Sequence, residues 1–513
     1  MSTTEKDSKV VESVDADVSV GMTEIVNEKL SMSKQFKSLW KSRRAVRAGV
    51  ACSSAAVLIG FDAMLMGSVI ANTEFLYKFG AYDEGLHVWT LPAYQQLIWT
   101  IVSSIGCMVG ALAIGILSDN FGRRFAFLTT VALTMIGTVV EVVSPNWKVW
   151  TLAKVLFGVA IGFMQGNTQS YVSEITPVHI RGFMLSLFQF WIILGSFLAS
   201  CVLEGTSTIN SSWSWKAAII SQLGLGLMCL ALFIPLVPES PYYLIGKSRH
   251  ESGRAALLRL RGKEIDYIVD EDIKNIEHVL ASEKRAKQDA SSYMECFRGT
   301  NLRRTLLAIL PLYMQQLLGF NLCGAYLAYF LSQSGIANPF VITVISLTLG
   351  MLAVIFAFVL VEHVGRRPQL LIGASAMLPC LLGMGILGFV NEGSAANNKA
   401  LAALSILWNI FYYVSVGAIG WTLVGEISSS RLRAKTTSFA VFANNILGIG
   451  LGIGIPYLIN ADETNLGPKS GFVFLVPGAI LVLIAYFVIP ETKNKSFEYL
   501  DHLFEVGTPA RKF

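Results

Sequence analysis

The segment Asp119-Asn120-Phe121-Gly122-Arg123-Arg124 recurs later in the chain as Glu362-His363-Val364-Gly365-Arg366-Arg367, and this repeat indicates the fold. Each copy lies between two long apolar segments. Each begins with an acidic residue and ends with glycine and two arginines. A motif that returns at equivalent places indicates a duplicated structural unit.

Two further pairs of segments recur in the same order and at nearly the same separation. The matched positions are Glu174 with Arg181 and Glu426 with Arg433, and then Pro238-Glu239-Ser240 and Pro490-Glu491-Thr492. One such match could arise by chance, but three in the same order predict two similar halves.

The composition indicates a membrane protein. Of the 513 residues, 53% are hydrophobic and 15% are charged, and the mean hydropathy is +0.55. A soluble protein has about a quarter of its residues charged, so much of this surface is expected to meet lipid. The net charge of +5 does not indicate nucleic-acid binding, because in such a chain the location of lysine and arginine matters more than their sum.

Twelve apolar segments are each close to the roughly 20 residues that a helix needs to cross a bilayer. They are 48–70, 95–117, 126–143, 149–171, 182–204, 216–236, 305–331, 339–361, 369–390, 401–424, 436–459 and 470–489. We therefore predict an all-α polytopic protein with two six-helix bundles, at 46–238 and 305–490. Between them, 239–304 is expected to form cytosolic amphipathic helices. Residues 1–45 are predicted to be a disordered cytosolic tail, and 491–513 a short cytosolic tail.

The basic residues set the orientation. The loops on one side hold most of them: Lys41, Arg43, Arg44, Arg47, Arg123, Arg124, Arg181, Arg366, Arg367, Arg431, Arg433, Lys435, Lys493 and Lys495. Positive loops face the cytosol, so both termini are expected there, in a multi-pass protein of the plasma membrane. Asn210-Ser211-Ser212 then lies outside, where a glycan acceptor is allowed.

Two like-oriented halves can rock about a central path and open it to one side at a time. Acidic and basic side chains at the cytosolic helix ends could pair across the halves and close that side. The candidates for this gating network are Asp119, Arg123, Arg124, Glu174, Arg181, Glu239, Glu362, Arg366, Arg367, Glu426, Arg433 and Glu491. The alternative is that the arginines only obey the positive-inside rule, which does not explain the matched glutamates and glycines.

Several segments together resemble the sugar porter family of the major facilitator superfamily, and among its members the fungal maltose and α-glucoside permeases. They include Gly60-Phe61-Asp62, YVSEITPVHIRG at 171–182, PESPYYL at 238–244, QQLLGFN at 315–321, WTLVGEISSSRLRAK at 421–435 and PETKNKSF at 490–497. The resemblance implies the major facilitator fold, a lipid-embedded monomer, a sugar as substrate, a proton as coupling ion, no other cofactor, and no nucleic-acid partner.

Two charged residues lie deep in predicted spans, where charges are costly and functional. Asp62 lies roughly 22 Å above Arg47 at 1.5 Å per residue, and Lys154 lies just below the outer end of the fourth span. Both therefore share one depth. We expect Asp62 to carry the coupling proton and Lys154 to hold it ionised while the two are paired. The resemblance implies arginine where Lys154 stands. A static ion pair is the alternative.

Amides and an aromatic ring suit a sugar, because amides both donate and accept hydrogen bonds. The resemblance implies substrate contacts at Gln189, Gln315, Gln316, Asn321, Trp421 and Asn444. Each amide could instead join helices. Adjacent residues such as Gln315 and Gln316 point about 100° apart on a helix, so only one of them faces the path squarely.

The chain departs from the family where paired tyrosines become Ala325-Tyr326, an asparagine becomes Gly350, and a proline-rich lead-in reads Gly417-Ala418-Ile419-Gly420. A wider, less polar site suits a disaccharide or a less polar metabolite. We therefore predict a sugar:proton symporter, with a facilitator or metabolite exporter on the same fold as the first alternative and a non-transporting receptor as the second. No nucleophile–base pair, metal cluster or phosphate loop indicates an enzyme.

Overall fold

The computed structural model describes residues 42–510, except 85–87, 177, 262–268, 289–292, 337, 391–393, 429–431, 460–463, 465, 494, 496 and 508. Most of the predicted tail at 1–45 therefore lies outside the described residues.

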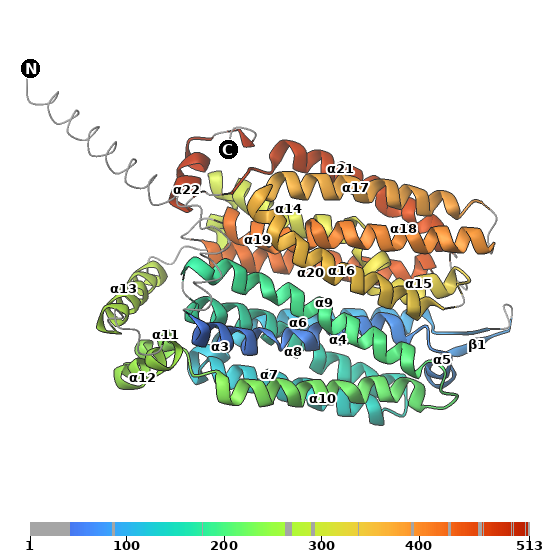
Figure 1. The fold of residues 1–513 in the computed structure, drawn as a ribbon, viewed down its shortest axis with the longest axis horizontal. Helices are drawn as coiled ribbons and strands as arrows, with labels where there is room; N and C mark the ends of the chain where they lie inside the picture. Colours follow the sequence, from blue (N-terminus) through green and yellow to red (C-terminus); the bar gives the residue numbers. More distant parts are fainter. Residues whose placement is uncertain are drawn as a thin grey trace, which may run out of the picture.

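The N-terminal half contains α3 (Arg43–Ser53), α4 (Ala56–Val69), α5 (Thr73–Phe79), α6 (Ala93–Phe121), α7 (Arg123–Val143), α8 (Trp147–Ile175), α9 (Val178–Thr206) and α10 (Trp213–Leu236). A short hairpin of β1 (Ala81–Asp83) and β2 (Val88–Thr90) lies between α5 and α6, with Tyr82 opposite Trp89. Figure 1 shows this hairpin at one end of the long helices. Sequence periodicity gave no indication of either α5 or the hairpin.

The linker forms α11 (Pro241–Gly246), α12 (His250–Arg261), α13 (Val269–Gln288) and the 3₁₀ turn η1 (Tyr293–Phe297). These helices gather at the end of the molecule opposite the hairpin (Figure 1). Ile245, Leu257, Val269 and Ile276 form their small apolar core. The linker is thus a helical cap on the predicted cytosolic side.

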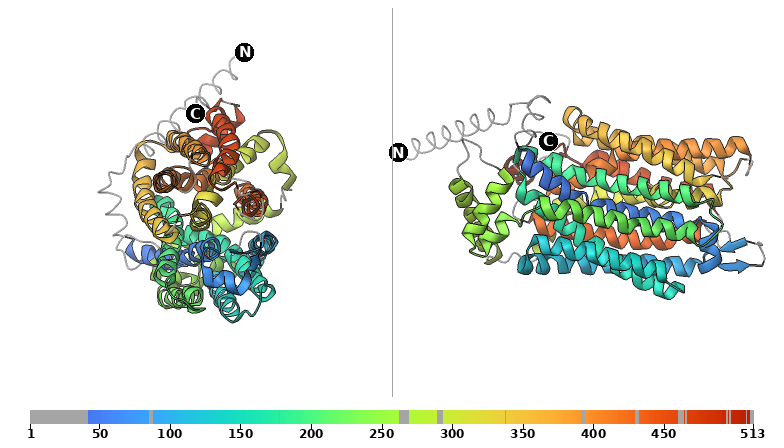
Figure 2. Two further views of the ribbon diagram at one scale, coloured as in Figure 1. Left: turned by 90° about the vertical axis from the view of Figure 1, so that its right-hand side faces the viewer. Right: turned by 60° about the horizontal axis from the view of Figure 1, so that its bottom comes forward.

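The C-terminal half contains α14 (Gly299–Leu317), the π-helical turn η2 (Asn321–Ala325), α15 (Leu327–Gln333), α16 (Pro339–His363), α17 (Arg366–Leu387), α18 (Ala395–Val414), α19 (Val416–Ile427), α20 (Arg433–Ile459), η3 (Gly467–Ser470) and α21 (Gly471–Val488), followed by α22 (Phe497–Glu505). The end-on view of Figure 2 shows the two halves as two groups of helices side by side.

Eleven helical segments among the described residues are long and apolar enough to cross a membrane. The remaining predicted crossing, at 305–331 and seventh in chain order, is broken. Gly319 has φ +94°, which ends α14 before η2 and α15 continue the path. Glycine takes this left-handed conformation without steric cost. The predicted arrangement of twelve crossings therefore includes a seventh one made of α14, η2 and α15.

Close backbone contacts join the helices within the N-terminal half. A Cβ atom on Gly60 would lie 1.8 Å from the carbonyl oxygen of Ile192, and one on Gly195 would lie 2.0 Å from that of Val57. Small residues allow helix backbones to approach closely in membranes. The contacts fix α4 against α9, the helix that also packs against α16 of the other half.

Candidate functional site

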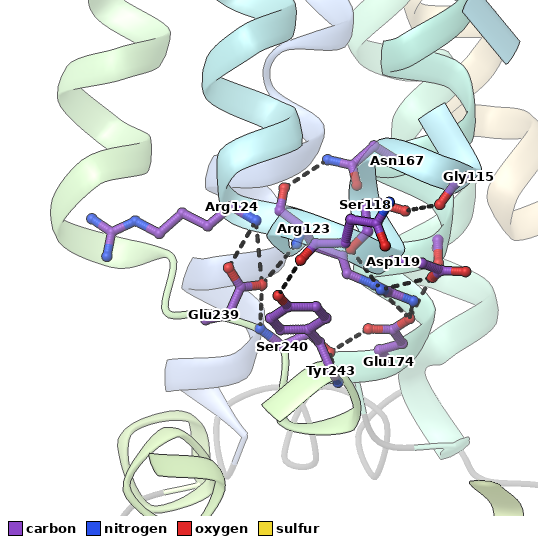
Figure 3. A network of polar contacts seen from close by, with 12 residues as sticks. Gly115, Ser118, Asp119, Arg123, Arg124, Asn167, Glu174, Glu239, Ser240 and Tyr243 are labelled. Carbon is purple, nitrogen blue, oxygen red and sulfur yellow. Dashed lines mark hydrogen bonds and ion pairs between the residues drawn. The ribbon is translucent and has the colours of Figure 1, made fainter. Parts of the chain in front are cut away.

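Glu239 joins the end of the sixth crossing to the start of α7, as Figure 3 shows. Its carboxylate accepts hydrogen bonds from the backbone amides of Arg123 at 2.8 Å and Arg124 at 3.3 Å. The first amides of a helix have no partner within it, so Glu239 caps α7. Gly122, with φ +97°, makes the sharp turn that exposes these amides.

The Arg123 guanidinium links two further acidic residues of the same half. It lies 3.1 Å from Glu174 and 3.2 Å from Asp119. Glu174 also accepts a hydrogen bond from Ser240, and Asn167 donates to the carbonyl oxygen of Arg123 at 2.9 Å. The network therefore ties α6, α7, α8 and α11 together at one end of the bundle (Figure 3).

The C-terminal half repeats this arrangement at the matched positions. Glu491 accepts from the backbone amides of Arg366 and Arg367, both at 3.1 Å, and Gly365 has φ +103°. The Arg366 guanidinium lies 3.2 Å from Glu426, which also accepts from Thr492 at 2.6 Å. The sequence repeat therefore corresponds to the same geometry in both halves.

The described members of the network pair within one half each, rather than across the halves. Glu239 and Glu491 directly follow the last crossing of their own half, which places each beside its own arginines. Arg124 and Arg367 donate to the carbonyl oxygens of Ile234 and Tyr486. The side chains of Arg181, Glu362 and Arg433 lie outside the described set. Pairing across the halves therefore stays a prediction for another conformation.

The two halves meet closely near the end that carries the hairpin. A Cβ atom on Gly67 of α4 would lie 1.9 Å from the carbonyl oxygen of Ala325, and one on Gly452 of α20 would lie 2.3 Å from the Thr100 side chain of α6. Because not even a methyl group fits at these two points, they leave no room for a solute between the halves. This conformation is therefore closed on the predicted outer side at these contacts.

Asp62 and Lys154 form the ion pair predicted from their common depth. The ammonium nitrogen lies 3.0 Å from a carboxylate oxygen of Asp62, with 1% and 6% of the two side chains exposed. A third charged group joins them, because Glu141 of α7 lies 2.7 Å from the same ammonium and is fully buried. Glu141 was missed from the sequence, although it is the one acidic residue of the apolar segment 126–143. A glutamate near the end of an apolar segment usually faces the membrane interface, so nothing in the sequence indicated its burial.

Aromatic rings surround this buried group. The Lys154 ammonium lies 5.7 Å from the centroid of the Trp150 ring and 5.1 Å from that of Phe157. Trp150 in turn packs against Phe75 and Phe79 of α5, with ring centroids 5.3 and 5.2 Å apart. Helix α5 and its aromatic contacts therefore cover Lys154 on the hairpin side and limit water access from there.

Three of the predicted substrate residues form a chain of amides in the C-terminal half. Asn321 donates to Gln316 at 3.0 Å, and Gln316 donates to Asn444 at 3.4 Å. They come from η2, α14 and α20, and all three are partly buried. An amide chain of this kind can exchange its internal hydrogen bonds for bonds to hydroxyl groups.

The other predicted contacts differ in their surroundings. Gln315, 7% exposed, donates to the carbonyl oxygen of Val416 at 3.0 Å, beside the break between α18 and α19, so it joins helices in this conformation. Trp421 is 40% exposed on α19, one residue after Gly420, which contacts Gln315. Gln189 of α9 is half-buried. The structure thus brings Gln316, Asn321 and Asn444 together in one hydrogen-bonded chain.

Comparisons with known proteins agree with this architecture. The family model described as "Sugar (and other) transporter" matches residues 13–504. The General alpha-glucoside permease of Saccharomyces cerevisiae is 29% identical over 503 residues, which cover 96% of this chain and 80% of that protein. The MFS transporter fmqE of Aspergillus fumigatus is 28% identical over 460 residues, which cover 88% of this chain and 84% of that protein. These relatives are transporters and permeases, which confirms the expectation of a transporter rather than an enzyme.

Among solved structures, the partially occluded inward-open form of the xylose transporter XylE from E. coli superposes with a TM-score of 0.73. The sequence identity is 20%, and the match covers 89% of this chain and 100% of that chain. The same transporter bound to 6-bromo-6-deoxy-D-glucose superposes with a TM-score of 0.72 at 21% identity, covering 90% of this chain and 100% of that chain. Likeness at this identity concerns the fold, and it confirms the predicted major facilitator architecture.

Proposed function

Since the chain belongs to the Sugar (and other) transporter family, we propose that it is a sugar:proton symporter that works by alternating access. It moves an α-glucoside or a hexose inward across the plasma membrane, with both termini in the cytosol. The observation that carries this proposal is the ion pair of Asp62 and Lys154, buried within the membrane-spanning bundle at 3.0 Å.

The buried pair provides a group that can take up and release a proton. A carboxylate beside an ammonium stays ionised, and loss of that contact favours the protonated acid. Asp62 lies on α4, whose outer end touches Ala325 of the opposite half. Rocking of the halves moves α4 relative to its neighbours, so opening and closing can change the distance between Asp62 and Lys154. Proton binding is thereby coupled to conformation.

The amide chain supports a polyhydroxy substrate. Gln316, Asn321 and Asn444 already bond to one another, and a sugar hydroxyl can replace either partner in such a bond. The half-exposed Trp421 supplies a flat apolar surface suited to a sugar ring. The names of relatives agree, because they include a General alpha-glucoside permease and a proton:xylose symporter.

The alternatives remain a facilitator or an exporter of a fungal metabolite on the same fold. The relative fmqE is named only as an MFS transporter, and the departures at Ala325-Tyr326 and Gly350 make the site less polar. A facilitator would need no proton, and an exporter would take up no sugar. A non-transporting receptor would show neither activity.

Uptake of labelled maltose, glucose and sucrose by transporter-null cells tests the proposal, with and without a protonophore. We expect at least one of these sugars to accumulate above its outside concentration, and the protonophore to abolish that accumulation. Uptake that the protonophore leaves unchanged indicates a facilitator. No uptake of any of the three sugars contradicts the proposal.

A further inference from the structure

Glu141 is a buried carboxyl group that the proposed coupling mechanism of Asp62 and Lys154 does not yet include. It is fully buried on α7, and its nearest polar contact is the Lys154 ammonium at 2.7 Å. Its second carboxylate oxygen has no hydrogen-bond partner among the described residues. Lys154 therefore contacts two carboxyl groups from two different helices, α4 and α7.

No other described charge balances this group. Of the helices packed against α7, α8 contributes Lys154, and α10 contributes the neutral amide of Gln222 beside Thr138. Lys216 of α10 lies over the Trp215 ring. Asp119 of α6 pairs with Arg123 at the cytosolic end. Among the residues that the structure describes, the charges acting on Glu141 are Lys154 and Asp62.

The charges of Asp62, Glu141 and Lys154 do not balance, and they leave an excess of buried negative charge. Two carboxylates and one ammonium, all ionised, carry a net charge of −1 in a group of side chains that are 6% exposed or less. An uncompensated buried charge costs several kcal/mol, whereas two carboxyl groups that share a site share one proton instead. The neutral arrangement holds one proton on the two acids and one on the lysine.

We propose that Glu141 and Asp62 share one proton around Lys154, and that Glu141 thereby sets the proton affinity of the site. When the proton is on Asp62, Glu141 remains as the anionic partner of Lys154. The Glu141 carboxylate then stabilises the charged form of Lys154. An arginine at this position would stay charged without such a partner. Glu141 acts through Lys154 and Asp62, so it is a positioning residue of the symport cycle. The inference deepens the proposed function and rests on it for its role in transport.

Infrared difference spectra of the purified protein test the shared proton without any substrate. The wild type is expected to show the carbonyl stretch of a protonated carboxylic acid at neutral pH that is absent from both Glu141→Gln and Asp62→Asn. Each variant leaves one carboxylate beside Lys154, a neutral pair that needs no further proton. Glu141→Asp keeps both acids and should keep the band. A Glu141→Gln protein that still shows the band overturns the proposal.

The pH dependence of sugar uptake tests the role in transport. Removing the Glu141 charge weakens proton binding by Asp62, so half-maximal uptake by Glu141→Gln should shift to lower pH by about one unit. Thr134→Val on the same helix is the control, because Thr134 is buried and its hydroxyl donates to the carbonyl oxygen of Thr130, one turn earlier on α7. A uniform loss of uptake without a shift indicates a structural role and contradicts the proposal. If the wild type moves sugar without protons, symport itself is wrong, and the infrared result alone decides the shared proton.

Discussion

At the scale of single residues, Asp62 and Lys154 show how depth in the membrane identifies partners. Both charges were predicted to lie at one level in neighbouring spans, and the structure places them 3.0 Å apart. Glu141 could not be predicted in the same way, because a glutamate near the end of an apolar segment usually faces the interface. Its burial depends on the packing of α7 against α8 and α10, and sequence periodicity does not predict that packing.

Asp62→Asn should abolish uphill accumulation while leaving exchange of sugar across the membrane. Asparagine keeps the size of the side chain but cannot carry the proton, so the carrier still moves when loaded with sugar on both sides. Counterflow of labelled sugar measures exchange, and accumulation in energised cells measures coupling. Accumulation at the wild-type level would show that Asp62 does not carry the coupling proton.

Gln316→Ala and Gln315→Ala are adjacent substitutions with different expected outcomes. Gln316 belongs to the amide chain, so its loss should weaken the apparent affinity for sugar about threefold to tenfold, the effect of one hydrogen bond. Gln315 bonds to Val416, so its loss should lower the free energy of unfolding by about 1 kcal/mol with a smaller change in affinity. Titration of uptake against sugar concentration and thermal unfolding separate the two. The reversed pattern would place Gln315 in the sugar site.

At the scale of elements, eleven crossings have the continuous apolar character from which spans are predicted, and the seventh does not. Gly319 breaks it, and α14 carries Arg303 and Arg304 as well as two glutamines. The prediction of a span at 305–331 was right in place but gave no indication of the break. A single glycine in an apolar run fits both a helix interior and a turn, so only the surrounding packing decides. The hairpin was missed because strands of three residues carry too little pattern.

Gly67→Ala tests the closure of the outer side by α4 and the seventh crossing. The added Cβ would lie 1.9 Å from the carbonyl oxygen of Ala325, and relief of such a clash costs about 1–3 kcal/mol. The closed conformation should become less populated and the transport rate should fall, while the amount of folded protein is unchanged. Gly205→Ala is the matched control, because a Cβ there meets nothing within 4 Å. Equal rates in the two variants would mean that this contact does not limit closure.

At the scale of the whole molecule, the sequence repeat found in the loops corresponds to a repeat in the structure. Glu239 and Glu491 cap α7 and α17 in the same way, and Gly122 and Gly365 share a left-handed backbone. The repeat was predictable because it depends on local motifs. The pairing of these side chains within each half, rather than across the halves, was not predicted, because the spacing of the motifs does not specify which helix ends lie side by side.

Glu239→Ala and Glu491→Ala should have nearly equal effects on stability, because the two carboxylates perform the same task in the two halves. Loss of a helix cap costs about 1–2 kcal/mol, and thermal unfolding of the purified proteins measures it. A large loss in one variant with no loss in the other would show that the halves do not depend on equivalent contacts.

The most direct test of coupled transport is the movement of protons that accompanies sugar. The purified protein would be placed in liposomes without a proton gradient, and maltose or glucose added outside while a dye reports the external pH. We expect the external medium to become more alkaline as labelled sugar enters, and we expect Asp62→Asn to abolish this change. Sugar entry with no change in external pH would contradict this expectation.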